Sequence, residues 1–153
     1  MNRQRRDMLR ISTAFGLAFA AGVLKPSDVF AAEWNGKAFD AKTLDAALAG
    51  LTSDTPLPSA NLAINAPDIA ENGAVVPVTV TSSMAGTDFL AVLIEKNPNP
   101  MSAGFTIPEG TEPSVSLRVK MGGTSKVYAL ARTGKSWHVA VKEIKVTMGG
   151  CGG

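Results

Sequence analysis

The stretch AVVPVTVT, residues 74–81, indicates the fold class of this 153-residue chain. Val76, Val78 and Val80 fall at alternate positions, whereas Thr79 and Thr81 lie on the opposite face, because successive side chains of a strand point to opposite sides. Pro77 has no N–H to donate to a neighbouring strand, which favours a sheet edge or an irregularity. The stretch therefore predicts a β-strand with one buried apolar face.

Short apolar segments continue on both sides of this stretch. Expected strands cover residues 62–64, 89–94, 103–107, 115–121, 127–131 and 137–146. Turn signals separate them at Asn72-Gly73, 97–100, 108–110, Gly122-Gly123 and Thr133-Gly134. The segment 89–94 is apolar on both faces, as in a central buried strand. About seven short strands with turns between them predict an all-β fold, an immunoglobulin-like β-sandwich.

The last expected strand changes the parity of its apolar residues. They are odd-numbered from Trp137 to Val141, whereas Ile144 and Val146 are even-numbered. One extra residue inserted into a strand turns the later side chains to the other face. We therefore expect a β-bulge at Lys142-Glu143.

A short helix is expected before the first strand. Asp40 is a candidate N-cap, and Gly50 suits the C-terminal end. Apolar residues follow the spacing of one helix face: Leu44, Ala47, Leu48 and Leu51. The predicted sandwich is thus preceded by one N-terminal helix.

Residues 1–31 have the layout of an export signal. Arg5-Arg6 precedes the 14-residue apolar stretch 11–24, which is too short and too rich in Gly and Ala for a comfortable membrane span. The arginine pair indicates the twin-arginine pathway, and small residues at 29 and 31 suit a signal peptidase. We expect cleavage after Ala31, leaving 122 residues in the periplasm without membrane attachment. The alternative is an N-terminal membrane anchor.

Composition excludes several classes of function. The signal segment carries +3 of a total charge of +2, so the remaining chain is at −1, and nucleic-acid binding would need a large basic surface. A single cysteine allows no intramolecular disulfide. With His138 as the one histidine, the chain lacks the ligands of a structural zinc or a blue-copper site. We expect no metal and no cofactor. Because the twin-arginine pathway exports folded proteins, we expect a partner that is exported together with this chain.

The C-terminal sequence MGGCGG, residues 148–153, places one cysteine among glycines. Cys151 is flanked by Gly149, Gly150, Gly152 and Gly153. Because glycine gives the backbone maximal freedom, residues 147–153 are predicted to form a flexible arm after a carrier domain of residues 32–146. From Thr147 to Cys151 an extended chain reaches roughly 15 Å. A thiol on such an arm could enter a narrow cleft in another protein.

Nothing next to Cys151 in the sequence would activate its thiol. A catalytic cysteine has its pKa lowered by a nearby base or helix N-terminus, whereas here the terminal carboxylate disfavours the thiolate. The thiol is therefore displayed rather than activated. An exported binding or adhesion module with an incidental cysteine tail is one alternative. A thiol enzyme, such as a sulfurtransferase or peroxidase, is another and needs a pKa well below about 8.5. A thiocarboxylate at Gly152-Gly153 would require ATP-dependent activation and a different fold.

The other polar candidates have structural interpretations. His138 is expected to be a surface or pairing residue of a strand. Lys142 and Lys145 lie near the arm and could attract an anionic substrate or partner enzymes. Lysines on an edge strand also discourage aggregation, which is the interpretation we favour.

The tail and three further segments resemble one protein family. The run KEIKVT (142–147) before the tail, APDIAENGAVVPV (66–78) and EKNPNP (95–100) are similar to SoxY, the carrier subunits of the periplasmic thiosulfate-oxidation system. The likeness extends from Phe39 to the end of the chain, and the twin-arginine signal agrees with it. Met148, where an aliphatic residue is common, is the one mild departure at the tail.

The resemblance implies a carrier without cofactor or catalytic activity of its own. It implies a heterodimer with SoxZ, a second β-sandwich subunit that lacks the cysteine. It also implies that a c-type cytochrome joins thiosulfate to the sulfur of Cys151, giving a cysteine S-thiosulfonate. A hydrolase would then release sulfate, and a sulfane dehydrogenase would oxidise the remaining sulfur. Gly149, Gly150, Gly152 and Gly153 would form the swinging arm.

Overall fold

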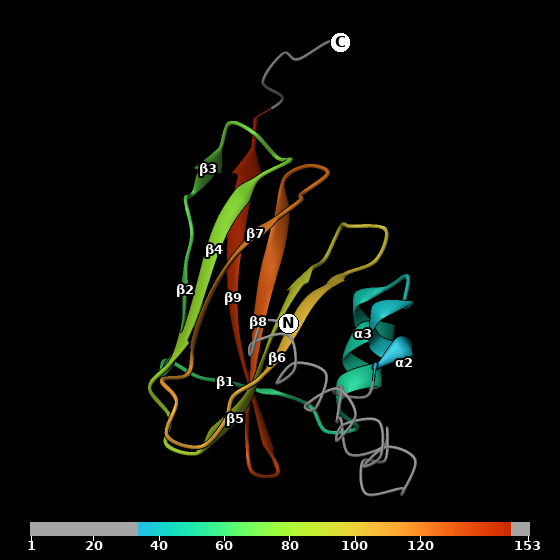
Figure 1. Ribbon diagram of the computed structural model, residues 1–153. Coiled ribbons are helices and arrows are strands. Elements are labelled where there is room, and N and C mark those ends of the chain that lie inside the picture. The colour runs from blue at the N-terminus through green and yellow to red at the C-terminus, as the bar shows by residue number, and fades with distance from the viewer. Residues whose placement is uncertain (1–33, 148–153) are drawn as a thin grey trace, which may run out of the picture. The chain divides into compact units, whose positions relative to one another are not determined.

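The computed structural model describes residues 34–147 of the chain (Figure 1). Two short helices come first, α2 (Gly36–Phe39) and α3 (Leu44–Leu51). The strands that follow are β1 (Leu57–Pro58), β2 (Leu62–Asn65), β3 (Ile69–Ala70), β4 (Val76–Ser82), β5 (Thr87–Ile94), β6 (Met101–Thr106), β7 (Ser114–Val119), β8 (Ser125–Thr133) and β9 (Ser136–Val146). None of the helices in this part of the chain is long and apolar enough to cross a membrane.

The strands form two sheets. The larger has the order β1-β9-β8-β5-β6, with β3 also paired to β9, and the smaller has the order β2-β4-β7. Both two-residue strands, β1 and β3, run parallel to β9, whereas the other pairs are antiparallel. Figure 1 shows the strands of the two sheets running in similar directions, as in an aligned sandwich. The predicted immunoglobulin-like β-sandwich with an N-terminal helical segment is confirmed.

The core between the sheets is built from the stretch that predicted the fold. The three valines of β4 are buried and pack with Leu90, Val92 and Ile94 of β5. Pro77 does not lie on an edge strand, since β4 is the middle strand of its sheet. However, β2 pairs only as far as Asn65 opposite Thr79, so beside Pro77 only β7 is paired. The proline is thus tolerated where β4 has one neighbour.

A second apolar cluster covers the outer face of the larger sheet. Ala38 and Ala47 of the helices are fully buried against Leu93, Leu130 and Trp137 of the sheet. The larger sheet is therefore covered on both faces, by the smaller sheet on one and by the helices on the other. This explains why β5 is apolar on both faces, as predicted for a central strand.

The β-bulge expected at Lys142-Glu143 is wrong. The register between β8 and β9 runs without a shift from Ser125 opposite Ile144 to Thr133 opposite Ser136. Trp137 packs against the helices, whereas Ile144 packs into the core between the sheets. The apolar residues of β9 change from odd to even numbers because the helices cover one face near Trp137, whereas the smaller sheet covers the other face near Ile144. No residue is inserted.

The expected helix is present as α3, but its N-cap is different. Thr43 caps it, with its Oγ1 accepting a hydrogen bond from the amide of Ala46 at 3.2 Å, whereas Asp40 is the C-cap of the additional helix α2. Gly50 lies inside α3, not after it. A Cβ on Gly50 would lie 2.7 Å from the backbone nitrogen of Ala38, so the glycine permits the close approach of the two helices.

Three of the predicted turns differ in whether they join strands of the same sheet or of the two sheets. Thr133-Gly134 belongs to the hairpin between β8 and β9, where Gly134 adopts a φ of 59°. Asn72-Gly73 and Gly122-Gly123 instead carry the chain from one sheet to the other, because β3 and β8 belong with β9 whereas β4 and β7 form the smaller sheet.

Candidate functional site

The residues predicted to carry the function lie outside the described residues. This holds for Cys151, for Gly149, Gly150, Gly152 and Gly153, and for the export signal with Arg5 and Arg6. The structure does describe the base of the predicted arm, from strand β9 to Thr147. Because Thr147 is four residues before Cys151, the surroundings of Thr147 determine where the cysteine segment starts.

Near its end, strand β9 keeps its pairing with β3 but loses its pairing with β8. Its pairing with β8 stops at Ser125 opposite Ile144, so the next residues depend on the short strand β3. The amide of Lys145 donates to the carbonyl oxygen of Asp68 at 2.9 Å, and the amide of Thr147 donates to that of Ala70 at 3.1 Å. Figure 1 shows β3 beside the end of β9. The last three described residues are therefore held chiefly by the segment around β3.

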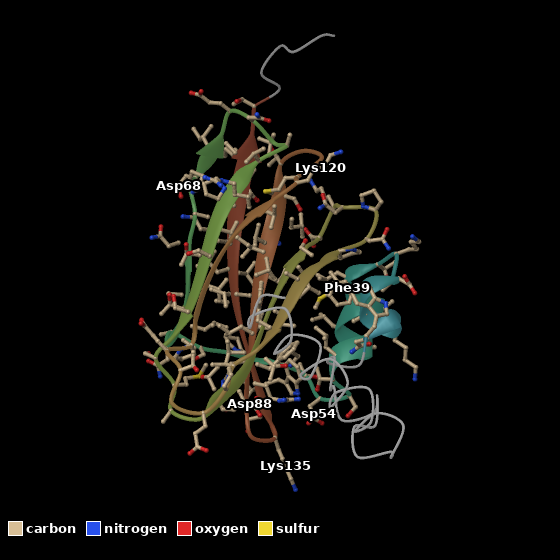
Figure 2. All side chains as sticks on the ribbon, in the orientation of Figure 1. Phe39, Asp54, Asp68, Asp88, Lys120 and Lys135 are labelled. Carbon is tan, nitrogen blue, oxygen red and sulfur yellow. The ribbon has the colours of Figure 1, made fainter. Side chains whose placement is uncertain are left out.

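A lysine of β9 fixes this segment. The Nζ of Lys142 lies 2.9 Å from Oδ1 of Asp68 and donates to the carbonyl oxygen of Ala66 at 2.5 Å. The Lys142 side chain is 29% exposed and that of Asp68 is 87% exposed. The hydrogen bond from Lys142, together with its positive charge, lowers the pKa of Asp68 below its ordinary value. Figure 2 labels Asp68 on the connection between β2 and β3.

A shallow groove opens beside the end of β9. It encloses about 610 Å³ and is lined by the turn 71–74, the loop 120–124, Val146 and Thr147. The two walls are joined by a hydrogen bond from the amide of Met121 to the carbonyl oxygen of Gly73 at 2.7 Å. On the loop side, Thr124 Oγ1 accepts a hydrogen bond from the amide of Val146 at 3.0 Å. The end of β9 is therefore held from both sides at this groove.

The other candidate residues named from the sequence are His138, Lys142 and Lys145, and all three lie in β9. His138 shares a hydrogen bond of 3.1 Å between its Nε2 and Oγ1 of Thr133, which agrees with a pairing residue in a strand. Lys145 is exposed, but the expected edge strand is wrong, because β9 lies between β8 on one side and β1 and β3 on the other. Lys142 differs, because its ammonium group is bound by Asp68 and Ala66. No local pattern in the sequence indicated this pairing, since Asp68 precedes Lys142 by 74 residues.

Within residues 34–147, no group of three or more His, Cys, Asp and Glu side chains is gathered to hold a metal ion. The pKa of Tyr128 is raised by desolvation and by Glu95, the carboxylate to which its hydroxyl group donates at 3.5 Å. This pair lies on β8 and the turn after β5, apart from the groove residues.

Comparisons with known proteins agree on one class. The family model "Sulfur oxidation protein SoxY" matches residues 48–151, a range that includes the cysteine position. A solved structure of the sulfur carrier protein SoxY from Chlorobium limicola f thiosulfatophilum is 38% identical, with a TM-score of 0.64, and the match covers 69% of this chain and 97% of that chain. A comparison with curated proteins gave no match.

These matches place the β-sandwich and its C-terminal cysteine segment among sulfur oxidation proteins. The chain belongs to the SoxY family. The family resemblance noted from residues 66–78, 95–100 and 142–147 is thereby confirmed.

Proposed function

We propose that the protein carries sulfur intermediates of thiosulfate oxidation as covalent adducts on the thiol of Cys151. One observation carries the proposal: β9 is a sheet strand up to Val146, so the cysteine is only four residues beyond the last anchored residue, Thr147. A fixed strand end followed by a short glycine-rich segment suits a thiol that has to enter the active sites of several enzymes in turn. Membership of the SoxY family supports the same function.

The loading chemistry is an oxidation that a partner completes. The S–H bond of Cys151 breaks, an S–S bond to the outer sulfur of thiosulfate forms, and one proton and two electrons leave. The proposed electron acceptor is a c-type cytochrome. Water then attacks the sulfonate sulfur in a hydrolase, releasing sulfate and leaving a persulfide, which a sulfane dehydrogenase oxidises. The disulfide-type linkage suits this cycle because it can be made and cleaved by redox or nucleophilic chemistry.

The distance along β9 favours a carrier over a thiol enzyme. His138, the chain's one imidazole, precedes Thr147 by nine residues of continuous extended chain, which spans roughly 30 Å. From Thr147 the thiol of Cys151 reaches only about 15 Å, even when fully extended. His138 therefore cannot serve as a general base for Cys151 of the same chain. The proposal assigns activation of the thiol to the enzymes that receive it.

The proposal places the mature chain in the periplasm after twin-arginine export, as a heterodimer with a SoxZ-like subunit. Exposed apolar side chains support such a partner. Leu57 of β1, Ile69 of β3 and Val141 of β9 are 61%, 56% and 50% exposed. All three belong to strands at the β9 edge of the larger sheet. Co-purification from the periplasm should yield one small second subunit, and a stable monomer without a companion would contradict this part of the proposal.

Intact-mass analysis tests the carrier function. The mature chain is incubated with thiosulfate, the cytochrome, an electron acceptor and the partner subunit, and is compared with a Cys151→Ser variant. We expect the wild-type mass to increase by one thiosulfate adduct that reductants remove, and the variant mass to remain unchanged. A wild-type chain that gains no sulfur, or a variant that supports oxidation, would exclude the proposal.

A further inference from the structure

Strand β3 is too short to be stable by itself. It consists of Ile69 and Ala70, pairs in parallel with Lys145 and Val146, and Ile69 is 56% exposed. Parallel pairing is slightly weaker per residue than antiparallel pairing, and two residues form few ladder hydrogen bonds. Since β8 no longer pairs beyond Ile144, detachment of β3 would leave the end of β9 with the hydrogen bond from the amide of Val146 to Oγ1 of Thr124.

The ammonium group of Lys142 closes the segment before β3 onto β9. It donates to the backbone at Ala66 and bonds to the side chain of Asp68, whose own carbonyl oxygen accepts from the amide of Lys145. An exposed ion pair alone contributes little, and Asp68 is exposed. The hydrogen bond from a charged, half-buried donor to a backbone carbonyl is stronger. Both contacts act on the same five-residue segment, 66–70.

We infer that Lys142 is a positioning residue for the cysteine: by holding residues 66–70 on β9, it sets Thr147 as the point where the arm begins. This inference rests on the proposed carrier function. Without this clamp of Lys142 on residues 66–70, the amides of Lys145 and Thr147 would lose their partners, and the hydrogen bond from the amide of Val146 to Thr124 would remain. Each opening of that remaining bond would lengthen the arm by three residues, roughly 10 Å. A longer tether lowers the effective concentration of the thiol at a docked active site. Lys142 therefore acts on delivery of the cysteine and does not take part in the sulfur chemistry.

Hydrogen exchange tests the structural half of the inference without any sulfur chemistry. The full-length mature chain is compared with Lys142→Met, which keeps an unbranched apolar stem, and with Lys145→Met, a matched loss of an exposed lysine on the same strand. In Lys142→Met we expect protection of the amides of Lys145 and Thr147 to fall about tenfold, the scale of one hydrogen bond to a charged group. The amides of residues 137–141, paired with β8, should be unchanged in both variants.

Loading kinetics test the functional half. With the proposed cytochrome as enzyme and the carrier as varied substrate, Lys142→Met should raise KM severalfold and leave kcat unchanged, because docking and reach change but the chemical step does not. Lys142→Arg should restore both readouts, since its guanidinium can donate to both acceptors. Lys145→Met should behave as wild type.

The outcomes separate the two claims. Unchanged protection in Lys142→Met, or lost protection with an unchanged KM, would overturn the positioning role and leave the carrier function intact. A wild-type chain that takes up no sulfur would remove the carrier function, while the exchange result would still report whether the clamp exists.

Discussion

Gly73 and Met121 approach each other more closely than any residue with a side chain would allow. The Met121 amide donates to the carbonyl oxygen of Gly73 at 2.7 Å, and a Cβ on Gly73 would lie 2.5 Å from the carbonyl oxygen of Met121. The same Cβ would lie 2.9 Å from Cγ1 of Val146. The two walls of the groove and the end of β9 therefore meet at a position that only glycine fits.

Replacing Gly73 by alanine should destabilise the protein. The obstructing atom is backbone and cannot rotate away, so overpacking should cost about 1–3 kcal/mol in the free energy of unfolding. Urea denaturation measures this. Gly123→Ala, in the opposite wall with open space around its Cβ, is the matched control and should change stability by less than about 0.5 kcal/mol. Equal effects of the two variants would contradict the close approach.

Gly50→Ala should also destabilise, against the usual helix preference. In an isolated helix alanine is better than glycine by about 1 kcal/mol. Here the new Cβ would lie 2.7 Å and 2.8 Å from the nitrogen and Cα of Ala38. The resulting steric overlap between α3 and α2 should cost more than the gain in helix propensity. The exposed neighbour Ala49→Gly should cost about 1 kcal/mol through propensity alone. A higher melting temperature for Gly50→Ala would show that the helices are not in contact there.

Protection of the end of β9 should depend on acid through Asp68. Its pKa is lowered in the folded protein by the hydrogen bond and charge of Lys142. The contribution of the pair is therefore fully present above the unfolded aspartate pKa, about 3.9, and is lost as the pH falls through the lower folded value. Exchange protection of the amides of Lys145 and Thr147 should thus be higher in wild type than in Asp68→Asn near neutral pH. The two should converge at strongly acidic pH, and a difference that persists there would contradict the assignment.

His138→Gln should leave thiosulfate loading unchanged. Glutamine can retain a hydrogen bond to Thr133, and the imidazole lies beyond the reach of Cys151. The measured quantity is the loading rate with the cytochrome present. A large fall in that rate, at unchanged stability, would favour a thiol enzyme with an internal base.

The strands were predictable from the sequence because one face of each is apolar. The stretch 74–81 and the two-sided segment 89–94 gave β4 and β5 correctly. The sequence could not tell which face of β9 is covered at each level, because Trp137 and Ile144 are equally apolar. Their opposite orientations follow from the helices covering one end of one face, which is a tertiary arrangement. For this reason the sequence pattern predicted a bulge in β9 that the structure does not contain.

The base of the arm was less accessible to sequence reasoning than the arm itself. The glycines around Cys151 stand out locally, whereas the clamp joins Lys142 to a segment more than seventy residues earlier. Asn72-Gly73 was recognised as a turn, but its contact with Met121 depends on how the two sheets meet. Long-range backbone contacts of this kind leave no periodic signal in the chain.

Peptide-level mass spectrometry of the C-terminal segment, on protein taken directly from cells oxidising thiosulfate, detects whether Cys151 carries sulfur covalently. We predict sulfur adducts on Cys151, among them a thiosulfonate and shorter sulfane forms, that disappear when thiosulfate is withdrawn. A C-terminal peptide that carries only an unmodified thiol throughout active oxidation would contradict a covalent carrier.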